Sequence, residues 1–369
     1  MFESAIEVLK KVEERGFKAY IVGGYVRDMY LSRISNDIDI CTSARPKDLL
    51  KIFNKDADIE EKYGSVKLKY DNYYFDITTF RKDFMYDDNR RPLKIEYVDS
   101  LKEDLLRRDF TINTLCIDDK KNIVDILNAK KDLDNKIIKT IRDANETIKE
   151  DSLRILRAIR FATVLNFKID IELEKAIKKN TLLLNNLSFN RKKSELDLIF
   201  SSDDYKYGIT LLEKFNLGKE LEISNLNNLK RTTNILGMWA QIEFSDNYPF
   251  TKEEKNFIKK IRELILYGKI DSYVLYKYGI DLCIILGEIL GLEKKYIIDL
   301  NNNLIIKSKE DINITVLEII KLLNIDPSNK IKYIINDIEH KIINGELDND
   351  RKKIEEYLAN NYWGDKNEK

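Results

Sequence analysis

A glycine pair followed by two closely spaced aspartates constrains this chain more than any other feature of its sequence. Gly23 and Gly24 come directly after the β-branched and aromatic residues 19–22, which predict a strand that ends at the glycines. Glycine lets the backbone turn sharply there, so that main-chain N–H groups can face phosphate oxygens. Residues 26–31 then predict the start of a helix. This order of elements is typical of a nucleotide-binding turn.

The aspartates lie in the segment from Asn36 to Ile40. Alternate side chains of a strand share a face, so we expect Asp37 and Asp39 to point one way and Ile38 and Ile40 to enter a core. Two carboxylates beside a phosphate-binding turn suit a site that holds two Mg²⁺ ions for nucleotidyl transfer. Either motif alone is more often an ordinary turn or a solvated strand edge. Their order and spacing together favour a site.

The segment from Gly23 to Asp39 resembles the head-domain signature of the class II tRNA nucleotidyltransferases and bacterial poly(A) polymerases, a family within the DNA polymerase β superfamily. Four more stretches resemble motifs of this family in the same order, and the resemblance covers nearly the whole chain. These stretches are residues 74–81, 107–113, 150–161 and 188–195.

The resemblance implies a role for each motif. Asp37 and Asp39 would bind the metal ions and act in catalysis with Asp76, a third carboxylate on a neighbouring strand. An exposed strand aspartate is an equally good interpretation of Asp76. Arginine suits phosphate because its guanidinium can donate two parallel hydrogen bonds. The expected nucleotide-binding residues are Gly23, Gly24, Arg27, Arg108, Asp109, Asn113, Asp151, Arg154, Arg157 and Arg160.

One predicted helix, from Glu146 to about Leu165, carries an unusual charged face. Asp151 and three arginines recur on it at every third residue, so they stay on one side. The plain alternative is ion pairing with nearby acids along the helix, which contributes only about 0.2–0.5 kcal/mol per pair. We disfavour that alternative because Asp151 is the only acid well placed for it. The face therefore predicts contact with an anionic ligand.

A carboxylate beside a guanidinium can also choose a nucleobase. The carboxylate only accepts hydrogen bonds and the guanidinium only donates them. Cytosine and adenine both offer an amino donor next to a ring-nitrogen acceptor, whereas guanine and uracil reverse this polarity and would leave buried groups unpaired. In the family that this chain resembles, the couple occupies the positions of Asp151 and Arg154. It would select C and A without a nucleic-acid template.

Residues 81–92 are polar and aromatic, and we expect them to form a mobile loop. In the family, a loop at this position helps the site to switch from C to A, and enzymes that add only the two cytidines have a shortened one. The long segment in this chain favours A addition, although enzymes that add only the terminal A also have it. Residues 142–145 depart from the family pattern, because they replace its usual Gly-x-Pro.

Composition excludes several other classes of protein. The 64 basic and 64 acidic residues give a net charge of zero, so RNA contacts must come from local patches. The three cysteines are widely spaced and form no CxxC motif, which favours a reducing cytoplasm. The single histidine, His340, lies far from every motif, so histidine acid–base catalysis is not expected. The most apolar run, residues 279–292, is too short to cross a bilayer.

The pattern of periodicities predicts an α+β fold. A nucleotidyltransferase head with a mixed sheet would occupy residues 1–142, followed by an all-α neck (143–200), body (201–298) and tail (299–369) that binds tRNA. Asp143 has capping-box spacing from Glu146 and would start the first neck helix. Strands are expected at residues 18–22, 36–41, 64–70, 73–80, 94–98, 112–117 and 123–126.

These features predict a Mg²⁺-dependent, template-independent enzyme that adds or repairs the 3′-terminal CCA of tRNA from CTP and ATP. Its partner would be the acceptor end of tRNA, with no membrane and no obligate protein partner. The nearest alternatives are an enzyme that adds only CC or only A, and a poly(A) polymerase. From other classes, we considered a non-catalytic RNA-binding relative and a small-molecule nucleotidyltransferase.

Overall fold

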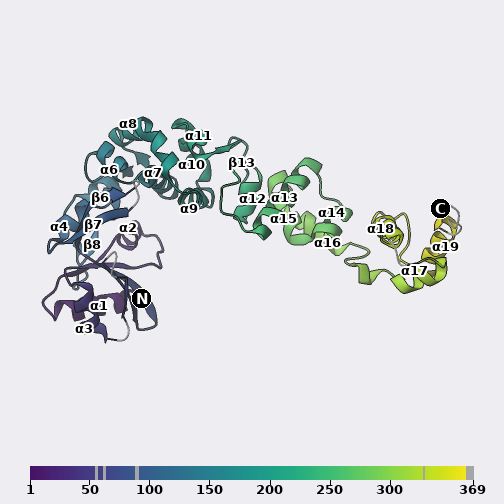
Figure 1. The fold of residues 1–369 in the computed structure, drawn as a ribbon, viewed down its shortest axis with the longest axis horizontal. Coiled ribbons are helices and arrows are strands. Elements are labelled where there is room, and N and C mark those ends of the chain that lie inside the picture. The colour runs from purple at the N-terminus through teal and green to yellow at the C-terminus, as the bar shows by residue number, and fades with distance from the viewer. Residues whose placement is uncertain (55–56, 61–63, 88–90, 327–328, 363–369) are drawn as a thin grey trace. The chain divides into compact units, whose positions relative to one another are not determined.

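The computed structural model describes the chain except for residues 55–56, 61–63, 88–90, 327–328 and 363–369 (Figure 1). Side chains of residues 57–60, 83–87, 91–94 and 329 are outside the description as well. The chain forms two compact units: residues 1–224 with 244–249, and residues 225–243 with 250–369. In the described chain, no helix is long and apolar enough to span a bilayer.

The first unit begins with a seven-stranded mixed sheet in the order β3-β4-β5-β2-β1-β8-β9. Only β2 and β5 are parallel neighbours, and their register places Asp39 opposite Asp76. The other neighbouring pairs are antiparallel. The strands are β1 (Ala19–Val22), β2 (Asp39–Thr42), β3 (Ala57–Glu60), β4 (Ser65–Tyr70), β5 (Tyr73–Thr79), β8 (Cys116–Ile117) and β9 (Ile123–Val124).

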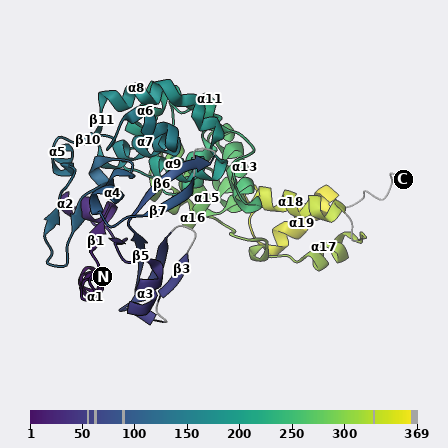
Figure 2. The same cartoon turned by 60° about the vertical axis from the view of Figure 1, so that its left-hand side comes forward.

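Helices α1 (Phe2–Glu13) and α3 (Pro46–Phe53) pack against this sheet (Figure 2). The predicted alternation at the aspartates is confirmed, since Ile38 and Ile40 are buried. Strand β2 begins only at Asp39, however, so the prediction that Asp37 lies within the strand is wrong. The head also contains α2 (Gly24–Tyr30), α4 (Leu101–Leu106), a 3₁₀ turn (Thr111–Asn113) where a strand was expected, and α5 (Ala129–Asp134).

Residues 81–97 form an antiparallel hairpin, so the predicted loop over residues 81–92 is wrong, whereas the strand predicted at 94–98 corresponds to the second strand of the hairpin. Strand β6 (Arg81–Asp87) pairs with β7 (Arg91–Tyr97), with Arg81 opposite Tyr97. The first strand was not predicted because residues 81–87 show no alternation of apolar and polar residues. The tip of the predicted loop, residues 88–90, lies outside the described residues.

The rest of the first unit is mainly helical, as predicted. Asp143 caps α6, since its side chain accepts a hydrogen bond from the N–H of Glu146. Helix α7 packs against α9 and α10, and Gly208 permits this approach because a Cβ there would lie 2.5 Å from Ile199 and 2.7 Å from Thr163. The elements are β10 (Ile137–Ile138), α6 (Ala144–Glu150), α7 (Leu153–Leu165), β11 (Lys168–Ile169), α8 (Ile171–Asn180), a 3₁₀ helix (Thr181–Asn186), α9 (Phe189–Phe200), α10 (Tyr205–Lys214), α11 (Gly218–Leu221) and β12 (Ile223–Ser224).

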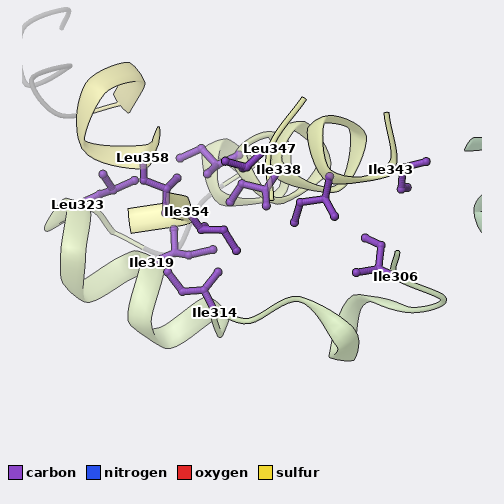
Figure 3. Close-up of a cluster of buried hydrophobic side chains, with 11 residues drawn as sticks. Ile306, Ile314, Ile319, Leu323, Ile338, Ile343, Leu347, Ile354 and Leu358 are labelled. Atoms are coloured by element: carbon purple, nitrogen blue, oxygen red, sulfur yellow. The ribbon is translucent and has the colours of Figure 1, made fainter. Parts of the chain in front are cut away.

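The second unit is built from helices, and its C-terminal part has an isoleucine-rich core of its own (Figure 3). Apolar side chains from α17, α18 and α19, such as Ile319, Ile338 and Ile354, meet there. Trp239 is fully buried elsewhere in this unit, edge-on to Phe250. The helices are α12 (Ile235–Ala240), α13 (Lys252–Tyr267), α14 (Ser272–Tyr278), α15 (Ile280–Leu290), α16 (Lys294–Asn302), α17 (Val316–Leu323), α18 (Asn329–Ile343) and α19 (Arg351–Tyr362).

Candidate active site

One cavity of the first unit, with a volume of about 570 Å³, is lined by every predicted site residue except Asp76. The turn between β1 and α2, the start of β2, the segment after α4 and one side of α7 all reach it. Arg81, Arg107 and Phe161, which the sequence did not single out as site residues, also line it. The predicted residues that it gathers are Gly23, Gly24, Arg27, Asp37, Asp39, Arg108, Asp109, Asn113, Asp151, Arg154, Arg157 and Arg160.

The glycine turn lies close to Asp39, at the start of strand β2. Gly23 has a φ of 86°, a conformation that side-chain-bearing residues rarely adopt. A Cβ at this position would lie 3.5 Å from Oδ2 of Asp39 and 4.0 Å from Nη1 of Arg108. The absence of a side chain therefore keeps space open between the backbone of the turn, the carboxylate and the guanidinium.

The electrostatics around Asp37 and Asp39 fit a divalent cation. Partial desolvation, and next the charge of Asp37, raise the pKa of Asp39 to about 6, with Arg108 opposing and Asp76 adding to the shift. Such a shift means that negative charge is under-compensated at Asp39. Within the described residues, no three ligand-type side chains converge on one point. The fit is therefore to the pair Asp37 and Asp39, while Asp76 lies in register on the next strand.

Arg27, in α2 directly after the glycine turn, is held by a network of hydrogen bonds. Its Nε and Nη2 both donate to the carboxylate of Asp28 at 2.9 Å, and Nη1 donates to Oδ1 of Asn113 at 2.7 Å. Asn113 in turn donates to Oδ1 of Asp109 at 3.1 Å. The buried guanidinium of Arg27 is thus fixed before any ligand arrives, which suits an anion-binding group.

Asp109 is a buried carboxylate shared between the head and α7. It accepts from Nε of Arg157 at 2.7 Å and from the N–H of Phe110 at 2.8 Å. Burial alone would raise the pKa of Asp109, but the charge of Arg157 and the hydrogen bonds from Asn113 and Arg157 outweigh it and lower the pKa to about 2. Asp109 therefore ties the arginine-bearing helix to the head.

We expect Asp109→Asn to lower the free energy of unfolding at pH 7 by about 3 kcal/mol, because Arg157 would lose its buried counter-ion. A depressed carboxyl pKa contributes stability above about pH 4 that is lost as the pH falls towards 2. The difference between wild type and variant should thus shrink below pH 4. Urea unfolding followed by circular dichroism at several pH values would measure it. Glu3→Gln is the control, since the Glu3–Lys121 pair is exposed and should contribute at most about 1 kcal/mol. An equal loss in both variants would contradict the prediction.

Asp104 anchors the two arginines that follow α4, and it was missed from the sequence. Its fully buried carboxylate accepts from Arg107 Nε at 2.9 Å, from Arg108 Nη2 at 3.1 Å and from the N–H of Arg81 at 3.3 Å. Burial would raise the pKa of Asp104, but the charges of Arg107 and Arg108 outweigh it and lower the pKa. The spacing of three and four residues to these arginines was the signal that could have identified it.

The predicted continuous helix over residues 146–165 is wrong, because it divides into α6 and α7 at Asp151. Asp151 has extended backbone angles (φ −147°, ψ 105°), and its Oδ1 accepts from the N–H of Leu153 at 3.0 Å. The side chain thereby satisfies a free N–H group at the start of α7. Arg191 of α9 holds the same carboxylate from 2.9 and 3.1 Å.

Arg154, in the first turn of α7, is equally well held. Its Nη1 donates to the carbonyl of Thr147 at 3.0 Å and to Oε2 of Glu150 at 2.9 Å, and its Nη2 donates to the carbonyl of Arg107 at 3.1 Å. A guanidinium has five N–H groups, so these contacts leave donors over for a ligand in the cavity. The structure therefore brings Asp151 and Arg154 to the cavity in fixed orientations.

The expectation that only Asp151 is well placed to pair with the arginines is wrong. Arg154 pairs with Glu150, Arg157 with Asp109 at 2.6 Å, and Arg160 with Glu195 at 3.0 Å. Asp109 and Glu195 are far from α7 in sequence, so helical spacing could not reveal them. Burial raises the pKa of Glu195, and the charges of Arg160 and Arg157 oppose this. The arginines nevertheless still line the cavity.

Phe161 packs among three of these arginines. The guanidinium carbons of Arg160, Arg27 and Arg157 lie 4.3, 5.0 and 5.2 Å from its ring centroid, within the range of cation–π attraction. Phe110 contacts the ring edge-on at 5.9 Å. The ring therefore helps to hold guanidiniums of like charge together on one wall of the cavity.

A mixed sheet with a glycine turn, an Asp-x-Asp edge and an arginine-rich helix over one cavity together define a nucleotidyltransferase. Three family models match along the chain: "Poly A polymerase head domain" over residues 19–139, "Probable RNA and SrmB- binding site of polymerase A" over 166–224, and "tRNA nucleotidyltransferase domain 2 putative" over 242–358. The chain belongs to the family of the CCA-adding enzymes, the class II tRNA nucleotidyltransferases, as its relatives show.

Similar proteins match over almost the whole chain. The CCA-adding enzyme of Pediococcus pentosaceus is 34% identical over 95% of this chain and 95% of its own length, and that of Ligilactobacillus salivarius is 32% identical over 95% and 94%. The crystal structure of the Bacillus stearothermophilus CCA-adding enzyme in complex with CTP has a TM-score of 0.85 at 25% identity, with 97% of each chain covered. Enzymes of this family use divalent metal ions, which the pair Asp37 and Asp39 fits.

Proposed function

We propose that this chain adds or repairs the 3′-terminal CCA of tRNA from CTP and ATP without a template. A single feature carries this proposal: the carboxylate pair Asp37 and Asp39 and the pair Asp151 and Arg154 line one cavity that further arginines also line. The named relatives favour this activity over a partial CC- or A-adding enzyme, a poly(A) polymerase or a non-catalytic RNA-binding protein. We place the activity in the cytoplasm.

In the proposed chemistry, one group of cavity residues acts on the phosphates and a second group recognises the base. Mg²⁺ ions bound by Asp37 and Asp39 would activate the 3′-hydroxyl of tRNA and neutralise the leaving pyrophosphate. Arg27, Arg108 and the N–H groups of the turn at Gly23 and Gly24 would hold the triphosphate. Asp76, in register with Asp39, would add a third carboxylate near the hydroxyl.

The second group of residues would recognise the base. Asp151 would accept from the amino group of C or A, and Arg154 would donate to the adjacent ring nitrogen. Asn113 and Asp109 fix Arg27 and Arg157 respectively, so we assign them to orienting the arginines that contact the nucleotide. Arg157 and Arg160 would contribute further nucleotide contacts beside Phe161.

We further propose that the predicted divisions at residues 142, 200 and 298 separate head, neck, body and tail. The helices after the head would hold the tRNA acceptor end mainly by its shape and backbone. Because the chain has no net charge, this binding should depend on local basic patches.

A primer-extension assay tests the proposed function directly. Purified protein would receive tRNAs that end before CCA, after C and after CC, with each triphosphate alone and with CTP plus ATP. We expect C, C and A to be added in that order and extension to stop. Sequencing-gel products lacking the terminal A, or long A tracts, would instead indicate a partial enzyme or a poly(A) polymerase.

We expect a shortened β6–β7 hairpin to add both cytidines but to lose most A addition, because the segment would help the site to accept the larger base. Because Asp83 is paired with Ile95, residues 84–94 can be removed and Asp83 joined to Ile95 through an Asn-Gly turn. This keeps the contacts of Arg81 with Asp104 and of Lys82 with Glu103. Rates of C and A addition on matched primers would measure the effect. Equal loss of both additions would count against a switching role.

A further inference from the structure

Arg142 joins the C-terminus of α4 to Glu150, the last residue of α6. Its Nη1 and Nη2 donate to Oε1 and Oε2 of Glu150 at 2.7 and 2.5 Å, and its Nε donates to the carbonyl of Leu106 at 2.8 Å. The hydroxyl of Thr140 donates to the backbone carbonyl of Arg142 at 2.8 Å. The bidentate pair of Arg142 with Glu150 has a defined orientation that a lysine cannot reproduce.

Glu150 lies between two guanidiniums. Oε2 accepts from Nη2 of Arg142 and also from Nη1 of Arg154 at 2.9 Å. Burial would raise the pKa of Glu150, but the hydrogen bond and charge of Arg142, and then those of Arg154, outweigh it and lower the pKa. Of the two arginines, Arg154 is almost buried, with 9% of its side chain exposed, whereas 37% of Arg142 is exposed. Arg142 therefore supports Arg154 from the solvent side.

The same two arginines bind consecutive carbonyls at the end of α4. Leu106 accepts from Arg142, and Arg107 accepts from Arg154 at 3.1 Å. Carbonyls at a helix C-terminus lack partners within the helix, and cations are favourable there. The side chains of Arg107 and Arg108 from this turn line the cavity. These contacts therefore fix the turn that carries Arg107 and Arg108 relative to Arg154, the proposed base-recognising arginine.

We propose that Arg142 is a positioning residue for nucleotide selection, which acts on Arg154 through Glu150; this proposal rests on the proposed CCA addition. Without Arg142, the carboxylate of Glu150 keeps only one counter-ion and can rotate. Arg154 then loses a fixed orientation and can turn its donors towards the carbonyl of uracil or guanine. Arg142 itself does not line the cavity, so its effect on selection must pass through its neighbours.

The test compares Arg142→Ala with a matched control. Arg45 also pairs with one carboxylate, that of Asp99 at 3.1 Å, and donates to one carbonyl, that of Val98. It also lies 4.9 Å from the ring centroid of Tyr97 in β7; 34% of its side chain is exposed, and it does not line the cavity. We expect Arg142→Ala to lower kcat/KM for CTP and ATP roughly tenfold, and to narrow the preferences for CTP over UTP and ATP over GTP by about the same factor. Arg45→Ala should change neither quantity.

Two further variants isolate the route of the effect. Arg142→Lys keeps the charge without the bidentate geometry and should restore only part of the selectivity. Glu150→Gln should narrow selectivity by itself, and combining it with Arg142→Ala should add little, since both act on the same contact. Melting curves of all variants, followed by circular dichroism, verify that the first unit stays folded at the assay temperature.

The outcomes separate this proposal from the proposed function. Failure of the wild type to add C and A would refute the function itself. An active wild type together with an Arg142→Ala variant of unchanged selectivity would overturn the positioning role. An equal fall for all four triphosphates, or additive effects of Arg142→Ala and Glu150→Gln, would overturn it as well.

Discussion

Asp39→Asn is expected to reduce nucleotide incorporation by about 1,000-fold or more. Loss of a group that stabilises transition-state charge typically lowers rates on this scale. An amide keeps the size of the side chain but removes the negative charge that a divalent cation needs. Incorporation of labelled CTP into tRNA lacking CCA, measured under single-turnover conditions, would give the factor. Binding of CTP in the absence of metal should change little.

The same variant should fold at least as well as the wild type. Desolvation and the charge of Asp37 raise the pKa of Asp39 to about 6, so the folded protein holds this proton more tightly than the unfolded chain does. Ionisation of Asp39 above that pH therefore costs stability, and asparagine avoids this cost. A melting temperature at pH 7.5 equal to or above that of wild type, with activity lost, would support a metal-binding role. Near-normal turnover would reject it.

Arg154→Ala is expected to have the second-largest effect, a fall of roughly 100-fold in kcat/KM for both CTP and ATP. The preference over UTP and GTP should collapse, because only the intact couple leaves buried groups unpaired when the wrong base binds. Competition between each correct and incorrect triphosphate on one primer would measure it directly. Retained selectivity at a lowered rate would mean that the base is read elsewhere.

Exchanging the charges of Asp151 and Arg154 would be a less clean test of base selection than removing one of them. Asp151→Arg combined with Arg154→Asp would set a new guanidinium beside Arg191 and a new carboxylate beside Glu150. Like charges at such distances destabilise a site in their own right. Arg154→Ala removes one partner without creating repulsion, and Arg45→Ala again serves as the control.

Strands β4 and β5 could be predicted because buried and exposed positions alternate along them, and β1 because it consists of β-branched and aromatic residues beside a glycine turn. Strands β1, β4 and β5 are confirmed, and so is the burial of Ile38 and Ile40. The first strand of the hairpin, β6, escaped prediction because residues 81–87 show no alternation of apolar and polar residues. The break at Asp151 escaped because the apolar spacing continues through it. It is set by the contact of the Asp151 side chain with the N–H of Leu153.

The candidate site was predictable where motifs are local and was incomplete where contacts are distant. Predicted residues from four separate segments line one cavity, which the resemblance anticipated. Their charge partners could not be read from the chain, because Glu195 and Arg191 belong to α9 while Asp109 comes from the head. Phe161 was counted with its helix, and only folding shows that it touches three guanidiniums.

The division into two units determines which optical signals can report on the cavity. Among the described residues the one tryptophan is Trp239, which is buried in the second unit, and the first unit has none. Emission from Trp239 would thus follow the melting of that unit and would not report damage around Asp109 or Asp39. Conversely, a tryptophan introduced into residues 1–224 would be the first such fluorophore there, and its spectrum would record the unfolding of the cavity against a background that comes from elsewhere in the molecule.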